Sequence, residues 1–523
     1  MCGIIGYNGC GDATLFIGQG LKNLEYRGYD SYGSGFVTPK ALFLHKSTGE
    51  LPQNYDKFLK NKVESNCGIG HVRWATTGKN TTKNSHPHYG GKNKNLLLVH
   101  NGIVSNYQKL KRILLKEGFN FISETDTEVL AHWICYNDHA KIKGDFACLF
   151  IKQNEEIIYA VRRNTPLFLA RINDDNILSS SLNVFDDLAT NYEYVELTND
   201  KIYKIGKTKI NANWTKVNNN PDSRRTAAII TLEEIKDQET ILHNHVKKLN
   251  KTKLVLFGCG SSYNAAVIAK HFFHKNKFSN VEVSLPSEIK ELDPKAQYIA
   301  ISQSGETKDV LDMARRLHGY KLCAITNKNH NTLETIADKT IYLNCGVEKG
   351  VAATKSFTST LNTLGQLAGE RINETALSKA IHKVLYTHYP KVPKSFKRLN
   401  NIFLFGSGVI HHVNCEGALK LKEMAHTHAE AINMAEMKHG PITLIDKDNL
   451  SIFVTKDQKT LESIEQVKAR NGEVLLLTVP KMSSELENLI LISIYLQIIA
   501  LELGRIRGIN VDRPVNLAKC ITI

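Results

Sequence analysis

The chain has 523 residues, which is too long for one ordinary hydrophobic core, so about two to four globular units are expected. Hydrophobic residues make up 42% and charged residues 23%, proportions that are ordinary for a globular protein and do not favour disorder. The formal charge is +15, but the basic residues are dispersed and the densest cluster, Lys247 to Lys253, is short, which favours a solvated face over a nucleic-acid-binding stripe.

Cysteine usage and apolar patterning bear on location and on metals. The ten cysteines include no Cys-x-x-Cys pair, so neither a zinc site nor a redox dithiol is predicted, and scattered thiols are typical of a reducing cytosol. The longest apolar stretch, Leu489 to Leu501, is interrupted by Ser493 and Gln497 and is too short to span a bilayer. We therefore expect a cytoplasmic protein in which this stretch is a buried helix, with no membrane partner, metal or other cofactor.

The first 205 residues contain many short β-like runs, such as Cys67–Val72 and Leu96–Val99, together with two helical stretches. The helices are predicted at about Leu15–Glu25 and Asp126–Tyr136, and Thr125 is a suitable N-cap for the second. This mixture predicts an α+β layered domain over residues 1–205.

The composition changes between Gly206 and Arg225, where the run from Asn218 to Asp222 is a turn and linker signal. The next stretch, Leu232 to Leu249, is typical of a connecting helix. Residues 206–249 are therefore expected to link the first domain to the rest of the chain.

After residue 250 the pattern becomes strand, loop and helix, and it is duplicated. Leu254–Gly260 matches Ile402–Gly408, Tyr298–Ser302 matches Ser451–Thr455, and Leu322–Thr326 matches Val474–Thr478. The common order and spacing predict two similar α/β lobes, each a doubly wound parallel sheet, over residues 250–385 and 386–523.

The cysteine at position 2 differs from an ordinary buried cysteine. Removal of Met1 would place its thiol beside a free α-amine, and this amine, whose ordinary pKa is near ~8, can serve as the base that activates the thiol. Nucleophile and base would then belong to one residue, an N-terminal-nucleophile arrangement suited to acyl transfer. Position alone is a weak signal, because a lone cysteine is more often a small core residue.

Further motifs follow Cys2 in order along the first 200 residues. Together they resemble the class II glutamine amidotransferase domain, and the resemblance implies the fold of an N-terminal-nucleophile hydrolase. The motifs are Met1–Gly6, Tyr26–Ser31, His71–Gly78, Ser85–His88, Val99–Gly102 and Glu124–Asp126.

The resemblance implies a role for each matching residue. Arg73 should hold the glutamine α-carboxylate, a task that suits its planar fork, and Asp126 should hold the α-ammonium. The Asn101 amide and the Gly102 backbone N–H should form the oxyanion hole. Further implied glutamine contacts are Trp74, which resembles a gate over the ammonia route, Thr76 and His86.

Arg27 and Asp30 have a plainer interpretation, in which they serve only to brace the Cys2 loop. The family's usual motif has His where this chain has Thr77, which affects contacts to glutamine rather than the reaction.

Polar loops follow two of the predicted strands after residue 250. Ser302-Gln303-Ser304-Gly305-Glu306-Thr307 opens a helix, Lys308–Leu317, and Gly258-Cys259-Gly260-Ser261-Ser262 repeats the arrangement at the preceding strand. Hydroxyls and free N–H groups at a helix start form a phosphate site, although one such turn is more often only a cap. Two loops on neighbouring strands favour a ligand crevice.

With Val351-Ala352-Ala353-Thr354-Lys355, these loops resemble the sugar isomerase (SIS) fold and the sugar-phosphate site of glucosamine-6-phosphate synthases. The second lobe lacks the serine-rich loop at the repeated position, so one sugar site is expected, with the second lobe supporting it. The implied sugar-phosphate contacts are Ser261, Ser262, Ser302, Gln303, Ser304, Thr307, Val351, Ala352 and Glu416.

Glu416, Lys420 and Glu423 stand at i, i+4 and i+7 and so share one helix face. A charged stripe is usually solvated, but this one follows the Gly-x-Gly turn of an α/β lobe, where ligands bind. In the synthase family the matching terminal lysine forms an imine with C2 of fructose 6-phosphate, the matching glutamate moves the proton, and the matching histidine opens the ring from a partner subunit. Carried over, these are Lys519, Glu423 and His439, assisted by Lys420.

The resemblance therefore implies a homodimeric amidotransferase that makes glucosamine 6-phosphate from L-glutamine and D-fructose 6-phosphate, with ammonia passing internally between the sites. Two alternatives remain open: an amidotransferase for a related sugar phosphate or fructosamine adduct, and a sugar-phosphate-sensing regulator. Glu423 with Lys519 argues against the first, and an intact Cys2 constellation against the second. The departures from the family pattern are Thr77, Ala353, Ala435 and Val515, and the chain is short for the family.

Overall fold

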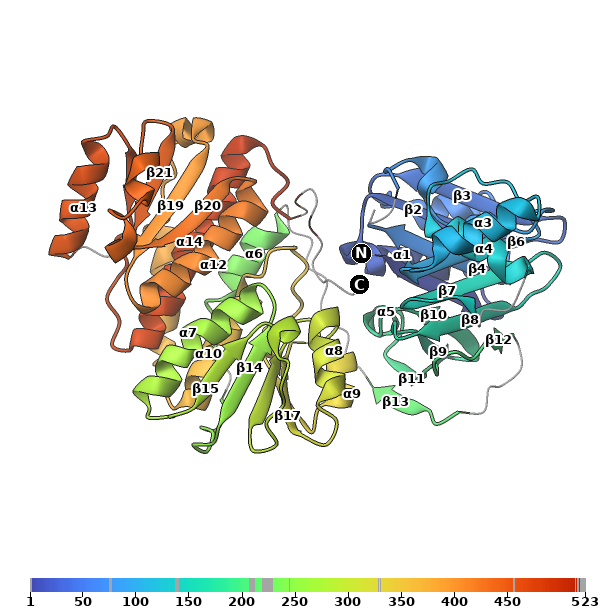
Figure 1. Cartoon of the computed structure of the whole chain (residues 1–523), viewed down its shortest axis with the longest axis horizontal. Coiled ribbons are helices and arrows are strands. Elements are labelled where there is room, and N and C mark those ends of the chain that lie inside the picture. The colour runs from blue at the N-terminus through green and yellow to red at the C-terminus, as the bar shows by residue number, and fades with distance from the viewer. Residues whose placement is uncertain are drawn as a thin grey trace. The chain divides into compact units, whose positions relative to one another are not determined.

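The computed structural model describes the chain except for residues 1, 75–77, 137–140, 207–211, 219–228, 244, 328, 330, 455–456, 513, 515–516 and 518–523. The chain divides into two compact units, the first within residues 1–223 and the second within residues 224–519 (Figure 1).

The first unit contains two antiparallel sheets. The larger sheet has the order β13-β11-β9-β10-β1-β4-β2-β3, with β1 Gly3–Asn8, β2 Ser31–Val37, β3 Leu42–Thr48, β4 Cys67–Arg73, β9 Phe168–Ile172, β10 Asp175–Ser179, β11 Asn191–Glu196 and β13 Thr215–Asn218. The smaller has the order β12-β8-β7-β6-β5, with β5 His88–Gly90, β6 Leu96–Gly102, β7 Phe146–Lys152, β8 Ile158–Arg163 and β12 Tyr203–Ile205.

Alternation along the strands divides the apolar side chains of this unit among three layers of core. Ile4 of β1 and Leu97 of β6 pack between the two sheets, whereas Ile5 of β1 packs under α1 (Ala13–Leu24) on the other face. The outer face of the smaller sheet is covered by two helices, α3 (Tyr107–Lys116) and α4 (Asp126–Tyr136), and that of the larger sheet also by α2 (Tyr55–Lys60) and α5 (Asn183–Leu188). The predicted α+β layered domain is therefore a helix–sheet–sheet–helix sandwich.

The second unit contains two all-parallel sheets with matching strand orders. The first is β15-β14-β16-β17-β18, with β14 Leu254–Gly258, β15 Val281–Ser284, β16 Gln297–Ile301, β17 Lys321–Thr326 and β18 Lys339–Tyr342. The second is β20-β19-β21-β22, with β19 Asn401–Gly406, β20 His428–Asn433, β21 Asn449–Phe453 and β22 Glu473–Leu476. The repeat seen in the sequence is thus confirmed strand by strand, and β18 is an addition to the first lobe.

Helices cover both faces of each lobe, as a doubly wound sheet requires. The inner helices of the two lobes share one hydrophobic core; they are α6 (Ile230–Asp237), α7 (Ser261–Lys275), α10 (Lys355–Ala368), α11 (Glu374–His382), α12 (Val409–Ala425) and α14 (Glu485–Arg507). The outer faces carry α8 (Lys308–Arg316) and α9 (Thr332–Ile336) in the first lobe and α13 (Gln458–Lys468) in the second. Because the inner core is continuous, the two lobes form one packed body.

Helix α14 is, among the described residues, the one helix long and apolar enough to cross a membrane, with a mean hydropathy of 1.9 over its best window. That window is 83% buried inside the protein, mainly against α12 and α10. A mostly buried core helix passes the same test, so the helix gives only weak evidence of a span, and the prediction of a buried helix at Leu489–Leu501 is confirmed.

The predicted connecting helix from Leu232 to Leu249 is wrong in its second half. Helix α6 ends at Asp237, and the described residues that follow run along α10 without helical structure. There, Val246 N donates to Gln366 Oε1 at 3.1 Å and Leu249 N donates to the Leu367 carbonyl at 2.9 Å. These tertiary hydrogen bonds replace the ones that a continued helix would make.

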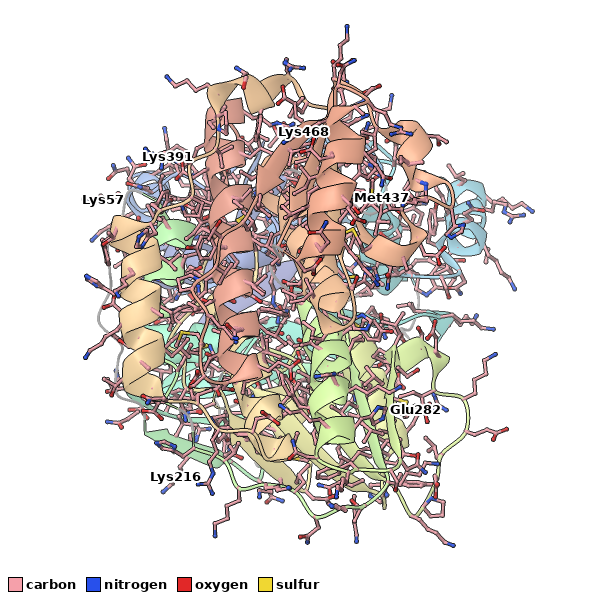
Figure 2. All side chains as sticks on the ribbon, turned by 90° about the vertical axis from the view of Figure 1, so that its left-hand side faces the viewer. Lys57, Lys216, Glu282, Lys391, Met437 and Lys468 are labelled. Carbon is pink, nitrogen blue, oxygen red and sulfur yellow. The ribbon has the colours of Figure 1, made fainter. Side chains whose placement is uncertain are left out.

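Basic side chains project from separate elements of the second unit. Lys391 and Lys468, labelled in Figure 2, are exposed, whereas Met437 is fully buried in the outer core of the second lobe. This is the dispersed arrangement that the sequence indicates.

Candidate active sites

The register of the larger sheet places Cys2 next to Arg73. Gly3 of β1 pairs with Val72 of β4, so Cys2 and Arg73 are the next residues along the two strands. Strand alternation turns both side chains toward the smaller sheet, as it does Ile4 and Ile69. The Cys2 thiol is 7% exposed and donates a hydrogen bond of 3.6 Å to the Trp74 carbonyl.

Burial raises the pKa of the Cys2 thiol, whereas the nearby Arg73 guanidinium acts in the opposite sense. Desolvation disfavours the thiolate, so a thiol in this position is protonated at neutral pH without a base to accept its proton. This electrostatic setting fits the expected reliance on an adjacent α-amine.

Asn101 is buried, yet its side chain makes no hydrogen bond to any described residue. It is 1% exposed, and both Nδ2 and Oδ1 are shielded from solvent without a partner in the described structure. It lies on β6 and, by strand alternation with Leu97 and Val99, faces the larger sheet. A buried amide without partners costs about 1–3 kcal/mol, a penalty that a bound ligand removes. The unpartnered Nδ2 is suited to donate a hydrogen bond to an oxyanion.

Gly102 follows at the end of β6 and must be a glycine. Its φ is +124°, and a Cβ atom would lie 2.2 Å from the Asp145 carbonyl oxygen. The absence of a side chain leaves its backbone accessible beside Asn101, as the oxyanion-hole hypothesis needs.

Asp126 begins α4 and is 7% exposed. Its Oδ2 accepts a hydrogen bond of 2.9 Å from Val104 N, which ties the start of α4 to the residues after β6. The predicted N-cap is confirmed, because Glu128 N donates to Thr125 Oγ1 at 3.4 Å. The charges of Cys2, Asp30 and Asp126 act on the pKa of Arg73, so these three groups lie around its guanidinium.

Arg27 has the bracing role that the plainer interpretation gave it. Its Nη1 donates to the Ser180 carbonyl at 3.2 Å and to Ser180 Oγ at 3.3 Å, and Ser180 Oγ accepts from Ile4 N at 3.2 Å. Arg27 thus supports β1 next to Cys2. Trp74 is half-buried and stacks edge-on against Tyr29 with ring centroids 6.0 Å apart. Thr76, with Thr77, lies outside the described residues.

Four buried histidines lie beside this region, and only one of them, His86, was proposed from the sequence. His71 Nε2 donates to the His100 carbonyl at 3.0 Å, and the rings of His71 and His86 lie 3.9 Å apart. His88 contacts Thr125 Oγ1 at 3.1 Å. Burial lowers the pKa of His100 and, still further, those of His71, His86 and His88. The cluster is therefore neutral at pH 7.

In the second unit, the serine-rich loop lies at the carboxyl end of β16. Ser302 is 2% exposed, and its hydroxyl lies 3.0 Å from Thr307 Oγ1 and 3.5 Å from Ser304 Oγ. Gly305 has φ +67°, and a Cβ there would lie 2.0 Å from Asn331 Oδ1. The Gln303 carbonyl accepts from Asn327 N at 3.0 Å. The loop is a tight turn whose hydroxyls gather at the start of α8.

The second polar loop, Gly258–Ser262, lies beside it, because β14 and β16 pair and a Cβ on Gly258 would lie 2.9 Å from the Ile301 carbonyl oxygen. Gly260, with φ +56°, is the N-cap of α7, so no side chain caps this helix. Ser262 N bonds to the Cys259 carbonyl at 3.2 Å. Two helix starts without side-chain caps, α7 and α8, therefore open at neighbouring strand ends.

The charged face of α12 reaches the start of α7. Ser261 Oγ donates to Glu416 Oε1 at 2.8 Å, and Asn264 Nδ2 donates to Glu416 Oε2 at 2.7 Å. Lys420 Nζ lies 3.3 Å from Glu416 and also hydrogen-bonds to Glu423 and, at 3.1 Å, to Ser261 Oγ. Glu416 is 1% and Lys420 0% exposed, so the stripe is not a solvated face.

Burial shifts the pKa values within this cluster. It raises the pKa of Glu416 despite the nearby Lys420. For Lys420, burial alone would lower the pKa, but Glu416 and Glu423 outweigh it and the pKa is raised. Lys420 therefore remains an ammonium that holds two carboxylates beside Ser261.

Val351 and Ala352 are buried in the segment before α10, and this segment meets the chain's last described residues. Val351 N donates to the Asp512 carbonyl at 3.1 Å. The Asp512 carboxylate accepts from Ile230 N and Thr231 N, at 3.0 and 2.7 Å, and so caps α6. Asp512 anchors the segment seven positions before Lys519, which itself lies outside the described residues.

His439 is exposed and is not among the partners of Lys420. Its backbone N–H bonds to the Glu436 carbonyl at 2.9 Å. Among the described residues, no hydrogen bond or ion pair joins His439 to Lys420.

Sequence reasoning missed Asn264, Ser180 and Glu348. Asn264 lies one turn after Ser261, a spacing that was readable. Glu348 is 4% exposed and accepts hydrogen bonds from Thr354 N at 2.9 Å and Ser356 Oγ at 2.6 Å, which holds the segment before α10. Neither Ser180 nor Glu348 belongs to a pattern that singles it out.

Comparison with known proteins agrees with this layout. A glutamine amidotransferase domain model matches residues 71–187, and a SIS domain model matches residues 249–369 and 395–496. The glutamine–fructose-6-phosphate aminotransferase [isomerizing] of Helicobacter pylori is 31% identical over 608 residues, with 100% of both chains covered. The protein of the same name from Pyrococcus horikoshii is 31% identical over 603 residues, again with full coverage.

A solved structure resembles part of the chain. The C-terminal domain of glucosamine-fructose-6-phosphate aminotransferase from Francisella tularensis is 25% identical with a TM-score of 0.48, and covers 56% of this chain and 100% of that domain. The aligned lengths of the full-length relatives exceed this chain's 523 residues, so those relatives carry segments that it lacks.

Proposed function

The chain belongs to the family of isomerizing glutamine–fructose-6-phosphate aminotransferases, and we propose that Cys2 and Lys519 carry the two halves of its reaction. The overall conversion is of L-glutamine and D-fructose 6-phosphate to L-glutamate and D-glucosamine 6-phosphate. The observation that carries the proposal is the buried amide of Asn101, which has no hydrogen-bond partner in the described part of the chain and, by strand alternation, faces the space between the sheets together with Cys2 and Arg73.

In the first half, the Cys2 thiolate attacks the side-chain carbonyl of glutamine after its proton passes to the free α-amine. Asn101 Nδ2 and Gly102 N–H stabilise the oxyanion, and ammonia leaves as the thioester forms. Arg73 binds the glutamine α-carboxylate and Asp126 its α-ammonium, while Trp74, Thr76 and His86 complete the contacts. Water then hydrolyses the thioester to glutamate.

In the second half, the amine of Lys519 forms an imine with C2 of the open-chain ketose and water is released. Ammonia then displaces the lysine amine from C2. Glu423 moves the proton between C1 and C2, and Lys420 holds its carboxylate in place. The phosphate binds at the starts of α7 and α8, with the hydroxyls of the serine-rich loop. The residues proposed to contact the sugar phosphate are Ser261, Ser262, Ser302, Gln303, Ser304, Thr307, Val351, Ala352 and Glu416.

We further propose a cytoplasmic homodimer in which His439 acts at the partner's sugar site; its side chain is exposed, and no hydrogen bond among the described residues joins it to Lys420 of its own chain. Residues 1–205 then form the glutaminase domain, 206–249 the linker, 250–385 the first SIS lobe and 386–523 the second lobe with the tail.

The test is to measure both products of the reaction in the wild-type chain and to compare glutamine hydrolysis between cysteine variants. The chain with glutamine and fructose 6-phosphate should form glucosamine 6-phosphate and glutamate in equal amounts. Cys2→Ala should lose glutamine hydrolysis by several orders of magnitude, on the order of 10⁴-fold or more, yet still bind fructose 6-phosphate. The matched control is Cys10→Ala, an exposed thiol of the same unit. Hydrolysis by Cys2→Ala at near the wild-type rate, or an active protein that retains Met1 by intact mass, would refute the nucleophile.

A further inference from the structure

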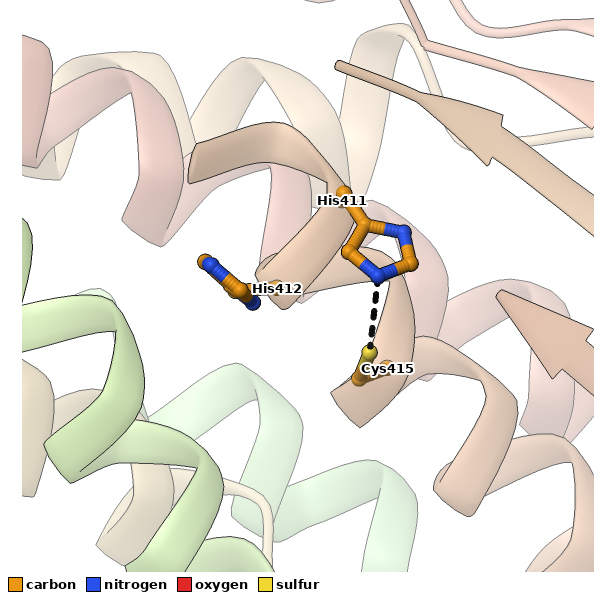
Figure 3. Close-up of side chains that lie close together, drawn as sticks. All are labelled: His411, His412 and Cys415. Carbon is orange, nitrogen blue, oxygen red and sulfur yellow. Dashed lines mark hydrogen bonds between the residues drawn. The ribbon is translucent and has the colours of Figure 1, made fainter. Parts of the chain in front are cut away.

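Three potential metal ligands gather in the first two turns of α12, outside the sites described above. They are His411, His412 and Cys415, and one donor atom from each lies within 4.8 Å of the other two. Cys415 follows His411 by four residues and His412 by three, so the thiol lies one helical turn below both rings. Figure 3 shows His411 directly above Cys415 and His412 beside them, on the side toward α7.

The separation of these donors is close to what one ion needs. Cys415 Sγ and His411 Nε2 lie 4.0 Å apart and are joined by a weak hydrogen bond. Two ligands of a tetrahedral zinc ion, at Zn–S of about 2.3 Å and Zn–N of about 2.0–2.1 Å, lie about 3.5 Å apart. A small rotation of the Cys415 and His411 side chains, which moves the two donor atoms closer by a fraction of an ångström, therefore brings them to ligating distance.

The surroundings allow an ion to enter. All three side chains are half-buried, so they are held by the fold but remain accessible to solvent. Their carrier is firmly placed, because α12 packs against α7 and α14 within the shared inner core. His411 Nδ1 is shielded from solvent and has no hydrogen-bond partner among the described residues. The other ring nitrogen, Nε2, is the one that faces Cys415 Sγ and would bind an ion.

We propose that His411, His412 and Cys415 bind one zinc ion, with the fourth position left to water. Two imidazoles and one thiolate form a donor set that borderline-soft Zn²⁺ prefers over Mg²⁺ or Ca²⁺, which take oxygen ligands. Binding breaks the S–H bond of Cys415, forms a Zn–S bond and releases one proton to solvent. This site differs from the sugar site on the same helix, whose residues Glu416 and Lys420 face Ser261.

A bound ion should make the start of α12 more rigid. An ion held by residues of the first and second turns fixes the geometry of the helix directly before Glu416, which contacts α7. Zinc should therefore protect the amides of this segment from hydrogen exchange and raise the melting temperature of the second unit, whether or not substrates are present.

Cobalt titration of the full-length Cys2→Ala chain tests the proposal, because this background removes the metal affinity of the nucleophile. One Co²⁺ per chain should give a thiolate-to-cobalt charge-transfer band that Zn²⁺ abolishes by displacement. Cys415→Ser should lose the band, and His412→Gln should weaken Co²⁺ binding by about tenfold or more. The control Cys10→Ser, an exposed thiol in the first unit, should keep both.

The proposal is overturned if the band persists unchanged in Cys415→Ser, or if no stoichiometric band forms in the parent chain. His412→Gln provides an independent arm, since its half-buried side chain is replaced without touching the thiol. Unchanged Co²⁺ affinity in a folded His412→Gln variant would equally contradict the site.

Discussion

Lys420, on α12 of the second lobe, donates a hydrogen bond of 3.1 Å to the hydroxyl of Ser261, the first residue of α7 in the first lobe. Glu416 binds the same hydroxyl from the same helix. The ammonium and carboxylates to which we assign proton transfer thus come from one lobe, and the helix start proposed to bind phosphate comes from the other. The two lobes thus contribute different groups: the first carries the serine-rich loop and the second the charged face of α12.

The first prediction concerns Lys420→Met, which leaves Glu416 and Glu423 without their buried counter-charge. Removal of one partner from a buried ion pair costs about 3–5 kcal/mol. All three tryptophans, Trp74, Trp133 and Trp214, lie in the first unit. The unfolding of the second unit, followed by far-UV circular dichroism, should therefore shift to lower denaturant while tryptophan fluorescence does not.

Its control is the double variant Lys420→Met with Glu416→Gln, which removes a charge of each sign. This pair should recover a large part of the lost stability. If the double variant is less stable than the single one by the full cost of a second independent mutation, the two groups do not interact as described.

The second prediction concerns Asn101→Ala. Since the amide has no partner among the described residues, its removal should leave the tryptophan-reported free energy of unfolding unchanged or slightly higher. Loss of an oxyanion-hole donor should lower kcat for glutamine hydrolysis by about 10²–10³-fold. Steady-state kinetics and denaturant unfolding measure the two effects separately.

Asn84→Ala is the matched control for Asn101→Ala. Asn84 is as buried, but its amide bonds to the Lys79 carbonyl at 2.8 Å and to Glu124 at 3.1 and 3.0 Å. This variant should lose stability. Equal destabilisation of both variants, or an Asn101→Ala variant with wild-type hydrolysis, would contradict the assignment.

The strand pattern held enough information to place part of the glutaminase site. The predicted strands Cys67–Val72 and Leu96–Val99 end just before Arg73 and Asn101. Both strands continue through these residues in the structure, so alternation puts Asn101 on the same face as Leu97 and Val99, and Arg73 on the same face as Ile69. The repeat likewise predicted both parallel lobes. The contact of Glu416 with Ser261 and Asn264 joins residues more than 150 positions apart, so no local pattern indicates it. Helix propensity after Asp237 gave a wrong prediction of continued helix, because α10 offers that segment other hydrogen-bond partners.

The third prediction is acid instability of the first unit. His71, His86, His88 and His100 have lowered pKa values in the fold because they are buried, and return to about 6.5 on unfolding. Below pH 6.5 the unfolded state binds the additional protons, so stability is full above this pH and falls as pH decreases toward the lowered values. Each histidine adds a slope of about 1.4 kcal/mol per pH unit.

Tryptophan-monitored urea unfolding between pH 7.5 and 5, with proton uptake measured in parallel, tests this slope. His86→Gln should reduce the uptake by about one proton. A stability that is flat from pH 7 to 5.5 would show that the cluster does not titrate on unfolding.

The last prediction concerns Lys519. Its neighbours in the sequence, Leu517, Ala518, Cys520 and Ile521, are apolar or small, which predicts an apolar environment for the amine. Such an environment would disfavour the charged amine and favour its neutral, nucleophilic form. The hydrogen bonds of Asp512 to Val351, Ile230 and Thr231 hold the chain near the segment before α10 seven residues earlier. Borohydride added with fructose 6-phosphate should therefore attach a hexitol phosphate to Lys519, found by peptide mass mapping.

Lys519→Ala should lose synthesis while Cys2 still hydrolyses glutamine, and the exposed control Lys391→Ala should keep both activities. Trapping at another lysine, or full synthase activity after deletion of residues 518–523, would refute the imine role, because no other amine in the proposal can replace it.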